Sequence, residues 1–271
     1  MDIFTLILLL GSLTFVTSNK TETPLIPENN NVNFRIIGGT GASEGEFPYQ
    51  ILLQERGEFT CGGSFITVNG THFVLTAAHC VRNVRRSILS VVAGEMDRNI
   101  VSGNEQTRSV TKIIIHRQFN YRNFANDIAL LAIDKPFTVN TYVSPIPLPK
   151  QGQRTTGDVI VTGWGLTSIF RRTDTRLLQQ VRLTILDDNP CRLLYLFPLR
   201  RILSSMLCAG KLIGGGDSCD GDSGGPMKAV NGDYLAGIVS WGTICAFPLQ
   251  PGVNTEVSHF IDWIEKQASS V

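Results

Sequence analysis

The stretch Gly221-Asp222-Ser223-Gly224-Gly225-Pro226 carries the strongest signal in the chain. Glycines let the backbone turn tightly, so that consecutive N–H groups can point at one place. Such N–H groups can stabilise an oxyanion while a serine between them attacks a carbonyl. A glycine-rich hairpin loop would use the same residue types without any chemistry. The two interpretations differ because a reactive serine needs a base, which must come from another part of the chain.

His79 is the best candidate for that base among the four histidines. It stands in Leu75-Thr76-Ala77-Ala78-His79-Cys80, where small residues and a cysteine can anchor an imidazole at the end of a strand. A general base needs to be positioned in this way. The other histidines lie beside predicted turns or at a predicted helix start, and we expect them to be structural or exposed: His72, His116 and His259.

Asp127 can orient the histidine. It lies in Asn126-Asp127-Ile128-Ala129-Leu130, just before an apolar run, so its carboxylate is expected to be partly buried. A buried carboxylate needs a partner, and His79 is the natural one. Ser223, His79 and Asp127 therefore form the hypothesis of a catalytic triad.

From residue 36 onward, short apolar runs alternate with clusters of Gly, Pro, Asn and Ser. Regularly spaced short strands of this kind favour β-barrels or a sandwich. The proline-containing stretch at residues 144–150 is the best candidate for a boundary between two halves. Helical spacing of apolar residues predicts a C-terminal helix over His259–Gln267. Examples of these expected strands are Tyr49–Leu53, Phe73–Thr76, Leu89–Ala93, Lys112–Ile115, Ile128–Ile133, Val159–Thr162, Gln180–Ile185 and Tyr234–Ser240.

Residues 1–18 have the features of a secretory signal peptide. Ile3–Val16 is an uncharged apolar run, shorter than the roughly 20 residues of a membrane-spanning helix. Val16 and Ser18 suit a signal-peptidase site, which predicts cleavage after Ser18 and a secreted, extracellular protein. The N-terminal region of a signal peptide is normally positively charged, but here Asp2 lies in it and lowers that charge. The alternative to a signal peptide is a membrane anchor.

Residues 19–35 are polar and should be flexible, since they cannot bury a core. They end at Arg35, directly before Ile36-Ile37-Gly38-Gly39.

Charge and cysteine content narrow the function. A net charge of +1 argues against nucleic acid as a partner. Six cysteines in a secreted chain favour three disulfides, although their spacing alone leaves fifteen pairings open. A zinc site is not expected, because no pair of cysteines has the C-x-x-C spacing.

Several motifs occur in the order in which the trypsin/chymotrypsin family has them: Ile36-Ile37-Gly38-Gly39, Thr76-Ala77-Ala78-His79-Cys80, Asp127-Ile128-Ala129-Leu130 and Gly221–Pro226. The chain also carries Cys61-Gly62-Gly63-Ser64, Thr162-Gly163-Trp164-Gly165, Met206-Leu207-Cys208-Ala209-Gly210 and Ser240-Trp241-Gly242. Over residues 36–271 the chain therefore resembles this family, and most of all its single-domain invertebrate trypsins.

The resemblance implies an all-β fold of two packed six-stranded antiparallel β-barrels with a C-terminal helix. It implies a zymogen whose propeptide, residues 19–35, is removed by cleavage after Arg35, so that the new Ile36 amine pairs with Asp222. The implied disulfides are Cys61–Cys80, Cys191–Cys208 and Cys219–Cys245.

The family's catalytic roles are carried by matching residues here. Ser223 would be the nucleophile, His79 the general acid and base, and Asp127 the orienting carboxylate. The backbone N–H groups of Gly221 and Ser223 would form the oxyanion hole.

The resemblance also implies a specificity pocket for Arg or Lys. Asp217 would lie at its base, where a buried carboxylate favours a substrate cation. Ser240, Gly242 and Gly252 would complete the substrate-binding walls. Protein or peptide substrates with Arg or Lys and protein protease inhibitors are the implied partners. The family pattern is a monomer that requires no cofactor and no membrane.

Three residues depart from the usual trypsin pattern. Ile244 replaces a glycine beside the pocket rim and should narrow the entrance. Asp220 replaces a frequent glutamine at the mouth of the site and should favour basic residues near the cleaved bond. Asn254 replaces a tyrosine that flanks the pocket.

Two surface features complete the comparison. Glu95 and Glu105 flank a loop that resembles the calcium loop of trypsins. Ser102 replaces one of the acids of that loop, which weakens the prediction of a calcium site at Glu95 and Glu105. Asn69-Gly70-Thr71 is a sequon for N-glycosylation in a predicted turn.

The expected function is thus endopeptidase activity after Arg or Lys. The alternative is a catalytically silent homologue that binds partners without cleaving them. Because Ser223, His79 and Asp127 are all present, the active enzyme is favoured.

Overall fold

The computed structural model describes residues 38–166, 175–196 and 201–271 of the chain. The predicted signal peptide and propeptide, with Arg35 and Ile36, lie outside the described residues. In the described part of the chain, no helix is long and apolar enough to cross a membrane.

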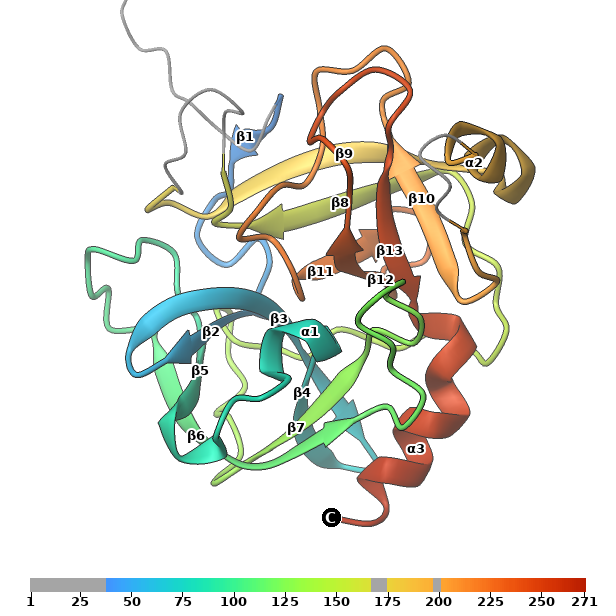
Figure 1. Cartoon of the computed structure of the whole chain (residues 1–271). Coiled ribbons are helices and arrows are strands. Elements are labelled where there is room, and N and C mark those ends of the chain that lie inside the picture. The colour runs from blue at the N-terminus through green and yellow to red at the C-terminus, as the bar shows by residue number, and fades with distance from the viewer. Residues whose placement is uncertain (1–37, 167–174, 197–200) are drawn as a thin grey trace, which may run out of the picture. The chain divides into compact units, whose positions relative to one another are not determined.

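The first half is a closed barrel of six antiparallel strands in the order β2-β3-β4-β7-β6-β5 (Figure 1). Neighbouring side chains of a strand face opposite ways: Ile51 and Leu53 fill the barrel, whereas Leu52 packs in a separate core. Both faces are therefore buried, which explains why these strands read as continuous apolar runs. The strands are β2 (Gln50–Glu55), β3 (Glu58–Val68), β4 (Thr71–Thr76), β5 (Leu89–Ala93), β6 (Gln106–Ile115) and β7 (Ala129–Ile133).

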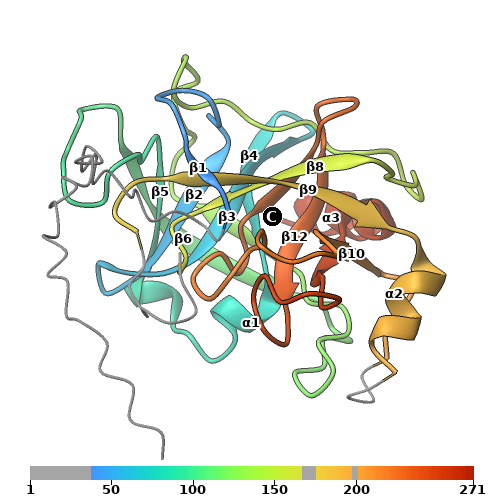
Figure 2. The ribbon, with the colours of Figure 1, turned by 90° about the horizontal axis from the view of Figure 1, so that it is seen from above.

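The second half is a sheet in the order β1-β9-β10-β13-β12-β11-β8, which closes because β9 also pairs with β8. The two-residue β1 (Thr40–Gly41) pairs with the first residues of β9, Gln179 and Gln180 (Figure 2). Six strands thus form the second barrel, as the resemblance implies. They are β8 (Asp158–Gly163), β9 (Gln179–Leu186), β10 (Met206–Gly210), β11 (Pro226–Ala229), β12 (Leu235–Trp241) and β13 (Gly252–Glu256).

One apolar cluster joins the two barrels. Leu75 and Leu130 of the first barrel pack in it with Leu235 and Ile238 of the second, and with the buried Trp164. The two barrels therefore hold a fixed orientation. Residues 144–150 lie in the segment that connects β7 to β8.

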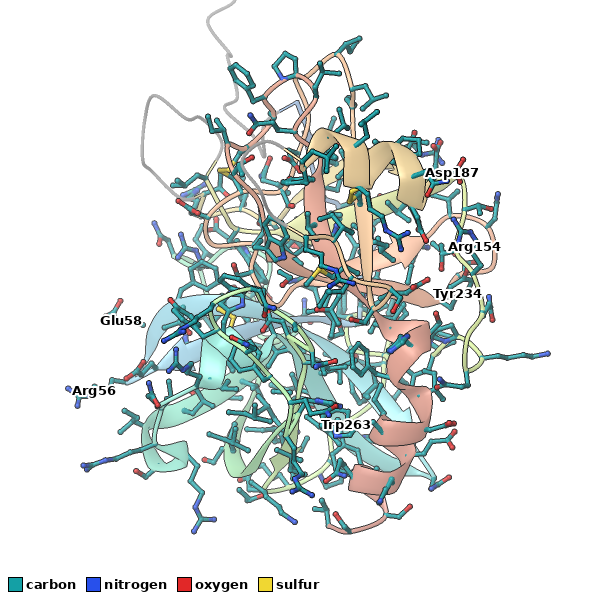
Figure 3. All side chains as sticks on the ribbon, turned by 45° about the vertical axis from the view of Figure 1, so that its right-hand side comes forward. Arg56, Glu58, Arg154, Asp187, Tyr234 and Trp263 are labelled. Atoms are coloured by element: carbon teal, nitrogen blue, oxygen red, sulfur yellow. A yellow bond between two sulfur atoms is a disulfide. The ribbon has the colours of Figure 1, made fainter. Side chains whose placement is uncertain are left out.

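The helices are short: α1 (Ala78–Val81), α2 (Asp188–Leu194) and α3 (Ile261–Ala268), with 3₁₀ turns at Arg86–Ile88 and Val257–Phe260. The C-terminal helix begins later than His259, because residues 257–260 form one of these 3₁₀ turns. Trp263 on α3 (Figure 3) packs against His116 of the first barrel, with ring centroids 5.3 Å apart. The last helix of the chain thus contacts the first barrel.

Candidate active site

The first barrel brings His79 and Asp127 together. β4 pairs with β7 so that Thr76 lies opposite Ala129. His79 follows β4 in the short helix α1, and Asp127 precedes β7, so the two side chains leave adjacent strand ends. Strand pairing therefore unites two residues that are far apart in the sequence.

Asp127 is fully buried and contacts His79 at two points, the imidazole and the backbone N–H. Its Oδ2 lies 2.7 Å from His79 Nδ1, and its Oδ1 accepts a hydrogen bond from the His79 backbone N–H at 2.9 Å. Ser240 Oγ donates to Oδ2 at 2.6 Å. These contacts fix the ring and favour a proton on Nδ1, which leaves Nε2 available as an acceptor.

Ser223 lies in the loop between β10 and β11, where glycines are required. Gly221 and Gly224 have positive φ angles of 96° and 77°, which residues other than glycine rarely adopt. A Cβ on Gly224 would also overlap Thr76 Oγ1 and the Gly62 carbonyl. The Gly62 N–H donates to the Ser223 carbonyl at 2.8 Å, so β3 of the first barrel supports the loop.

The backbone N–H groups of Gly221 and Ser223 have no acceptor among the described residues. The turn around them is closed by other amides: Asp222 N–H donates to the Cys219 carbonyl, and Gly225 N–H to the Asp222 carbonyl, each at 2.9 Å. The loop is thus rigid, while the two N–H groups remain available for an oxyanion.

His79 and Ser223 line the same cleft, which has a volume of about 400 Å³. Within the described residues, Ser223 Oγ and His79 Nε2 are not yet joined by a hydrogen bond. Such bonds are often long before a substrate binds. The cleft therefore contains a base and a hydroxyl that a bound substrate can bring into reach.

Asp217 lies in the same cleft and is almost fully buried, at 3% exposure. Burial raises its pKa to about 7, despite hydrogen bonds from the backbone N–H groups of Ser218 at 2.8 Å and Ala246 at 3.1 Å. Among the described residues this carboxylate forms no ion pair, and a cation that enters the cleft would supply one.

The walls of this pocket come from strands β12 and β13 and from two loops that the Cys219–Cys245 disulfide joins. Ser240, Gly242 and Gly252 line the cleft together with Asp217. A Cβ on Gly252 would lie 2.8 Å from Asp217 Oδ1, whereas one on Gly242 would meet no atom within 4 Å. Gly252 is thus needed for close packing, and Gly242 leaves the slot open.

Asp222 is completely buried beside Ser223, and burial raises its pKa to about 6. Its carboxylate accepts hydrogen bonds from the backbone N–H groups of Gly165 and Cys219, each at 2.9 Å. None of the described lysines and arginines forms an ion pair with it. The acid therefore lies in the protein without a charged partner among the described residues.

The three departures from the family pattern occupy different environments. Ile244 and Asp220 line the cleft and are exposed. Asn254 is buried and donates through Nδ2 to the Gly252 carbonyl at 3.2 Å. Ile244 and Asp220 can thus contact a substrate directly.

The six cysteines form Cys61–Cys80, Cys191–Cys208 and Cys219–Cys245, the pairing that the resemblance implies. Cys61, His79 and Cys80 gather their ligand atoms within 4.8 Å of one another. This is not a metal site, because both sulfur atoms belong to a disulfide and carry no thiolate.

Glu95 and Glu105 lie near each other, as the calcium loop would require. Burial, and then the negative charge of Glu105, raise the pKa of Glu95. However, Glu105 already accepts hydrogen bonds from the backbone N–H groups of Ser102 and Gly103. No third His, Cys, Asp or Glu joins them among the described residues. Calcium takes six to eight oxygens, so these two carboxylates would need backbone carbonyls and water to complete a site.

Some contacts of the site were not predicted from the sequence. Phe124 packs edge-on against the His79 ring at 5.6 Å and lies 6.4 Å from the Trp241 ring. Thr255 Oγ1 donates to the Asp127 carbonyl at 2.8 Å. Ser240 was expected only as a wall of the pocket, yet its hydroxyl binds Asp127. No local pattern distinguishes Phe124 or Thr255, because their roles depend on how the barrels meet.

Two β-barrels with a serine, a histidine and an aspartate at a shared cleft define the class of two-barrel serine hydrolases. Comparison with known proteins narrows this class. Residues 36–264 match the family model described as Trypsin. Trypsin-1 of Astacus astacus is 47% identical over 242 residues, which is 86% of this chain and all of that protein. Trypsin of Sus scrofa is 38% identical over 232 residues, 86% of this chain and 95% of that protein. The chain belongs to the trypsin family of serine proteases.

Proposed function

We propose that this protein is a secreted endopeptidase that cleaves peptide bonds after Arg or Lys and is made as an inactive precursor. The observation that carries the proposal is Asp217, a buried carboxylate in the cleft that also contains Ser223 and His79. A substrate guanidinium or ammonium would pair with it and place the following peptide bond beside Ser223.

The proposed reaction begins when Ser223 Oγ attacks the scissile carbonyl and His79 Nε2 takes its proton. Asp127 keeps the imidazole oriented through Nδ1 and stabilises the imidazolium. The oxyanion is bound by the N–H groups of Gly221 and Ser223. His79 then protonates the leaving amine, and a water molecule hydrolyses the acyl-enzyme by the same steps in reverse order.

Other features fit this role. Trypsin-family enzymes act on proteins, are inhibited by protein protease inhibitors and need no cofactor. Exposed Asp220 at the cleft would favour basic residues near the cleaved bond. Asn69 is exposed at the turn between β3 and β4, where a glycan would meet no steric obstacle from the barrel core.

The test is cleavage of a diverse peptide library by the activated protein, beside the Asp217→Ser variant. We expect cleavage almost only after Arg or Lys, and loss of that preference in the variant. Labelling by an active-site serine phosphonate separates the active enzyme from the catalytically silent homologue. A preference for Phe or Leu in the wild type would refute the pocket assignment.

A further inference from the structure

The Gly221 N–H group, one of the two donors for the oxyanion, must stay available to the substrate. It has no acceptor among the described residues, so a hydrogen bond of its own does not hold it. Its peptide group is held at the other end, where the Asp220 carbonyl accepts a hydrogen bond from the Leu166 N–H at 2.8 Å. Because the C=O and N–H of a trans peptide point in opposite directions, this contact aims the Gly221 N–H away from Leu166. Gly221 remains the most permissive residue of the loop, and packing must restrain it.

Two neighbours enclose Gly221. A Cβ on Gly221 would lie 2.9 Å from Gly165 Cα and 3.5 Å from Phe59 Cε1. Gly165 follows β8 of the second barrel, whereas Phe59 is a half-buried residue of β3 in the first barrel. The edge of the Phe59 ring is thus a second contact, beside the one at Gly62, that β3 makes with the oxyanion loop.

The Phe59 ring is itself held on two sides. The Arg98 guanidinium lies over the ring, 4.6 Å from its centroid, and the Trp164 ring packs edge-on at 6.1 Å. Arg98 donates through both Nε and Nη2 to the Thr175 carbonyl, at 3.0 and 2.7 Å. Two bonds from one rigid guanidinium to one oxygen fix its position, so the cation can hold the ring in place.

We propose that Phe59 is a positioning residue for the oxyanion hole, and that Arg98 acts through it by holding its ring against Gly221. This inference rests on the proposed function, since the oxyanion belongs to that reaction. A displaced Gly221 would bind the transition state less well. The substrate cation would still find Asp217, which Ser218 and Ala246 hold independently. Loss of the ring contact should therefore lower kcat more than it raises KM.

The variants are Arg98→Gln, which removes the cation, and Phe59→Leu, which removes the ring. Arg108→Gln is the matched control. Arg108 also lies over an aromatic ring, that of Phe137 at 5.1 Å, and donates through Nε and Nη2 to one carbonyl, that of Pro136. It belongs to β6 and does not line the cleft. The control thus removes the same kind of contact at a distance from the oxyanion loop.

Two inhibitors separate the oxyanion hole from the specificity pocket. Benzamidine, an amidine, would occupy the Asp217 pocket without forming an oxyanion. A peptide argininal carries an aldehyde in place of the cleaved bond. Ser223 Oγ adds to the aldehyde carbon, the hydroxyl proton passes to His79, and the carbonyl oxygen becomes an oxyanion. Of the two, only the argininal reports on the Gly221 N–H.

We expect Arg98→Gln and Phe59→Leu each to lower kcat and weaken argininal inhibition about tenfold, because a misplaced oxyanion donor costs rate. KM and the inhibition constant of benzamidine should change by less than about twofold. Arg108→Gln should behave like the wild type in all four measurements. Because Arg98 acts through the ring, the double variant should lose no more than Phe59→Leu alone.

Equal weakening of benzamidine and the argininal in Arg98→Gln would overturn the positioning role. Additive losses in the double variant, or an equal effect of Arg108→Gln, would also overturn it. Should Phe59→Leu not fold, the comparison of Arg98→Gln with Arg108→Gln decides by itself. A wild type that cleaves after neither Arg nor Lys would instead overturn the proposed specificity, and the aldehyde of the preferred residue would then replace the argininal.

Discussion

At the scale of single residues, two buried carboxylates of the site, Asp127 and Asp217, have different surroundings. Asp127 accepts hydrogen bonds from an imidazole, a backbone amide and a hydroxyl, whereas Asp217 is held by two backbone amides and by the Ser218 side chain. Asp127 is thus paired in the resting protein. Asp217 has no ion-pair partner in the part of the chain that the structure describes, so a bound cation would supply one and the protonation state of Asp217 controls binding.

Binding of a cation should therefore depend on pH. The Asp217 pKa is raised to about 7, so below that pH the carboxyl is neutral and must lose a proton before pairing. In a His79→Ala variant, which removes the imidazole from the cleft, the Kd of benzamidine should rise about tenfold per pH unit below pH 7. Isothermal titration calorimetry checks this between pH 5 and pH 8, a range that extends roughly two pH units below the Asp217 pKa and one above it. A constant Kd over that range would contradict it.

Ser223→Ala tests the nucleophile. The variant removes one hydroxyl, while the loop remains held by the Gly62 N–H. We expect an unchanged melting temperature and a fall in kcat of about a million-fold if the three residues act as a unit. Circular dichroism and peptide hydrolysis measure the two quantities. Activity close to that of the wild type would show that another group performs the attack.

At the scale of elements, β3 connects the barrels at the reactive serine. Gly62 of β3 donates to Ser223, and a Cβ on Gly62 would lie 2.7 Å from Gly225 Cα. This is backbone against backbone, which no side-chain rotation can relieve. Gly62 thus allows the first barrel to approach the catalytic loop of the second.

Gly62→Ala should displace the loop and lower kcat/KM by at least about tenfold, with a loss of about 1–3 kcal/mol in the free energy of unfolding. Gly41→Ala is the matched control: Gly41 also lies in a strand, and its Cβ would meet no atom within 4 Å. Peptide hydrolysis and urea denaturation compare the two. Equal effects of both substitutions would contradict the close approach.

The strands show how far the sequence predicts the fold. The eight expected strands all appear, with ends shifted by a few residues or, for β6, extended towards the N-terminus. β1, β3, β10, β11 and β13 were not among the apolar runs singled out in the sequence. β3, β10 and β13 contain glycine, which is disfavoured in strands and present here for close packing. The residues of the site carried local motifs, whereas Phe124 and Thr255 act only through the tertiary arrangement.

At the scale of the whole molecule, Asp222 and Gly38 bear on activation. Gly38 is the first described residue, and a Cβ on it would overlap the Gly215 carbonyl. The chain thus enters the protein beside the loop that carries Asp217. Asp222 lies buried without a charged partner among the described residues, and an ammonium on Ile36 would supply one after cleavage at Arg35.

Arg35→Gln should therefore remain an almost inactive precursor, whereas Arg35→Lys, which keeps a trypsin-type cleavage site, should become active. Hydrolysis of an Arg peptide after treatment with trypsin, together with N-terminal sequencing, checks both variants. The active form should begin at Ile36. Full activity of Arg35→Gln, or an active form that begins elsewhere, would refute the proposed activation.

The tight passage at Gly38 also bears on how the protein can be produced in the laboratory. Extra residues left in front of Ile36, such as a purification tag or a remnant of a fusion partner, would leave the Ile36 nitrogen in a peptide bond. Ile36 would then have no free amine to pair with Asp222. Val271, by contrast, is exposed at the end of the chain and takes no part in the cleft. An affinity tag therefore belongs after Val271, and a heterologous cleavage sequence placed before Ile36 must leave no residue behind.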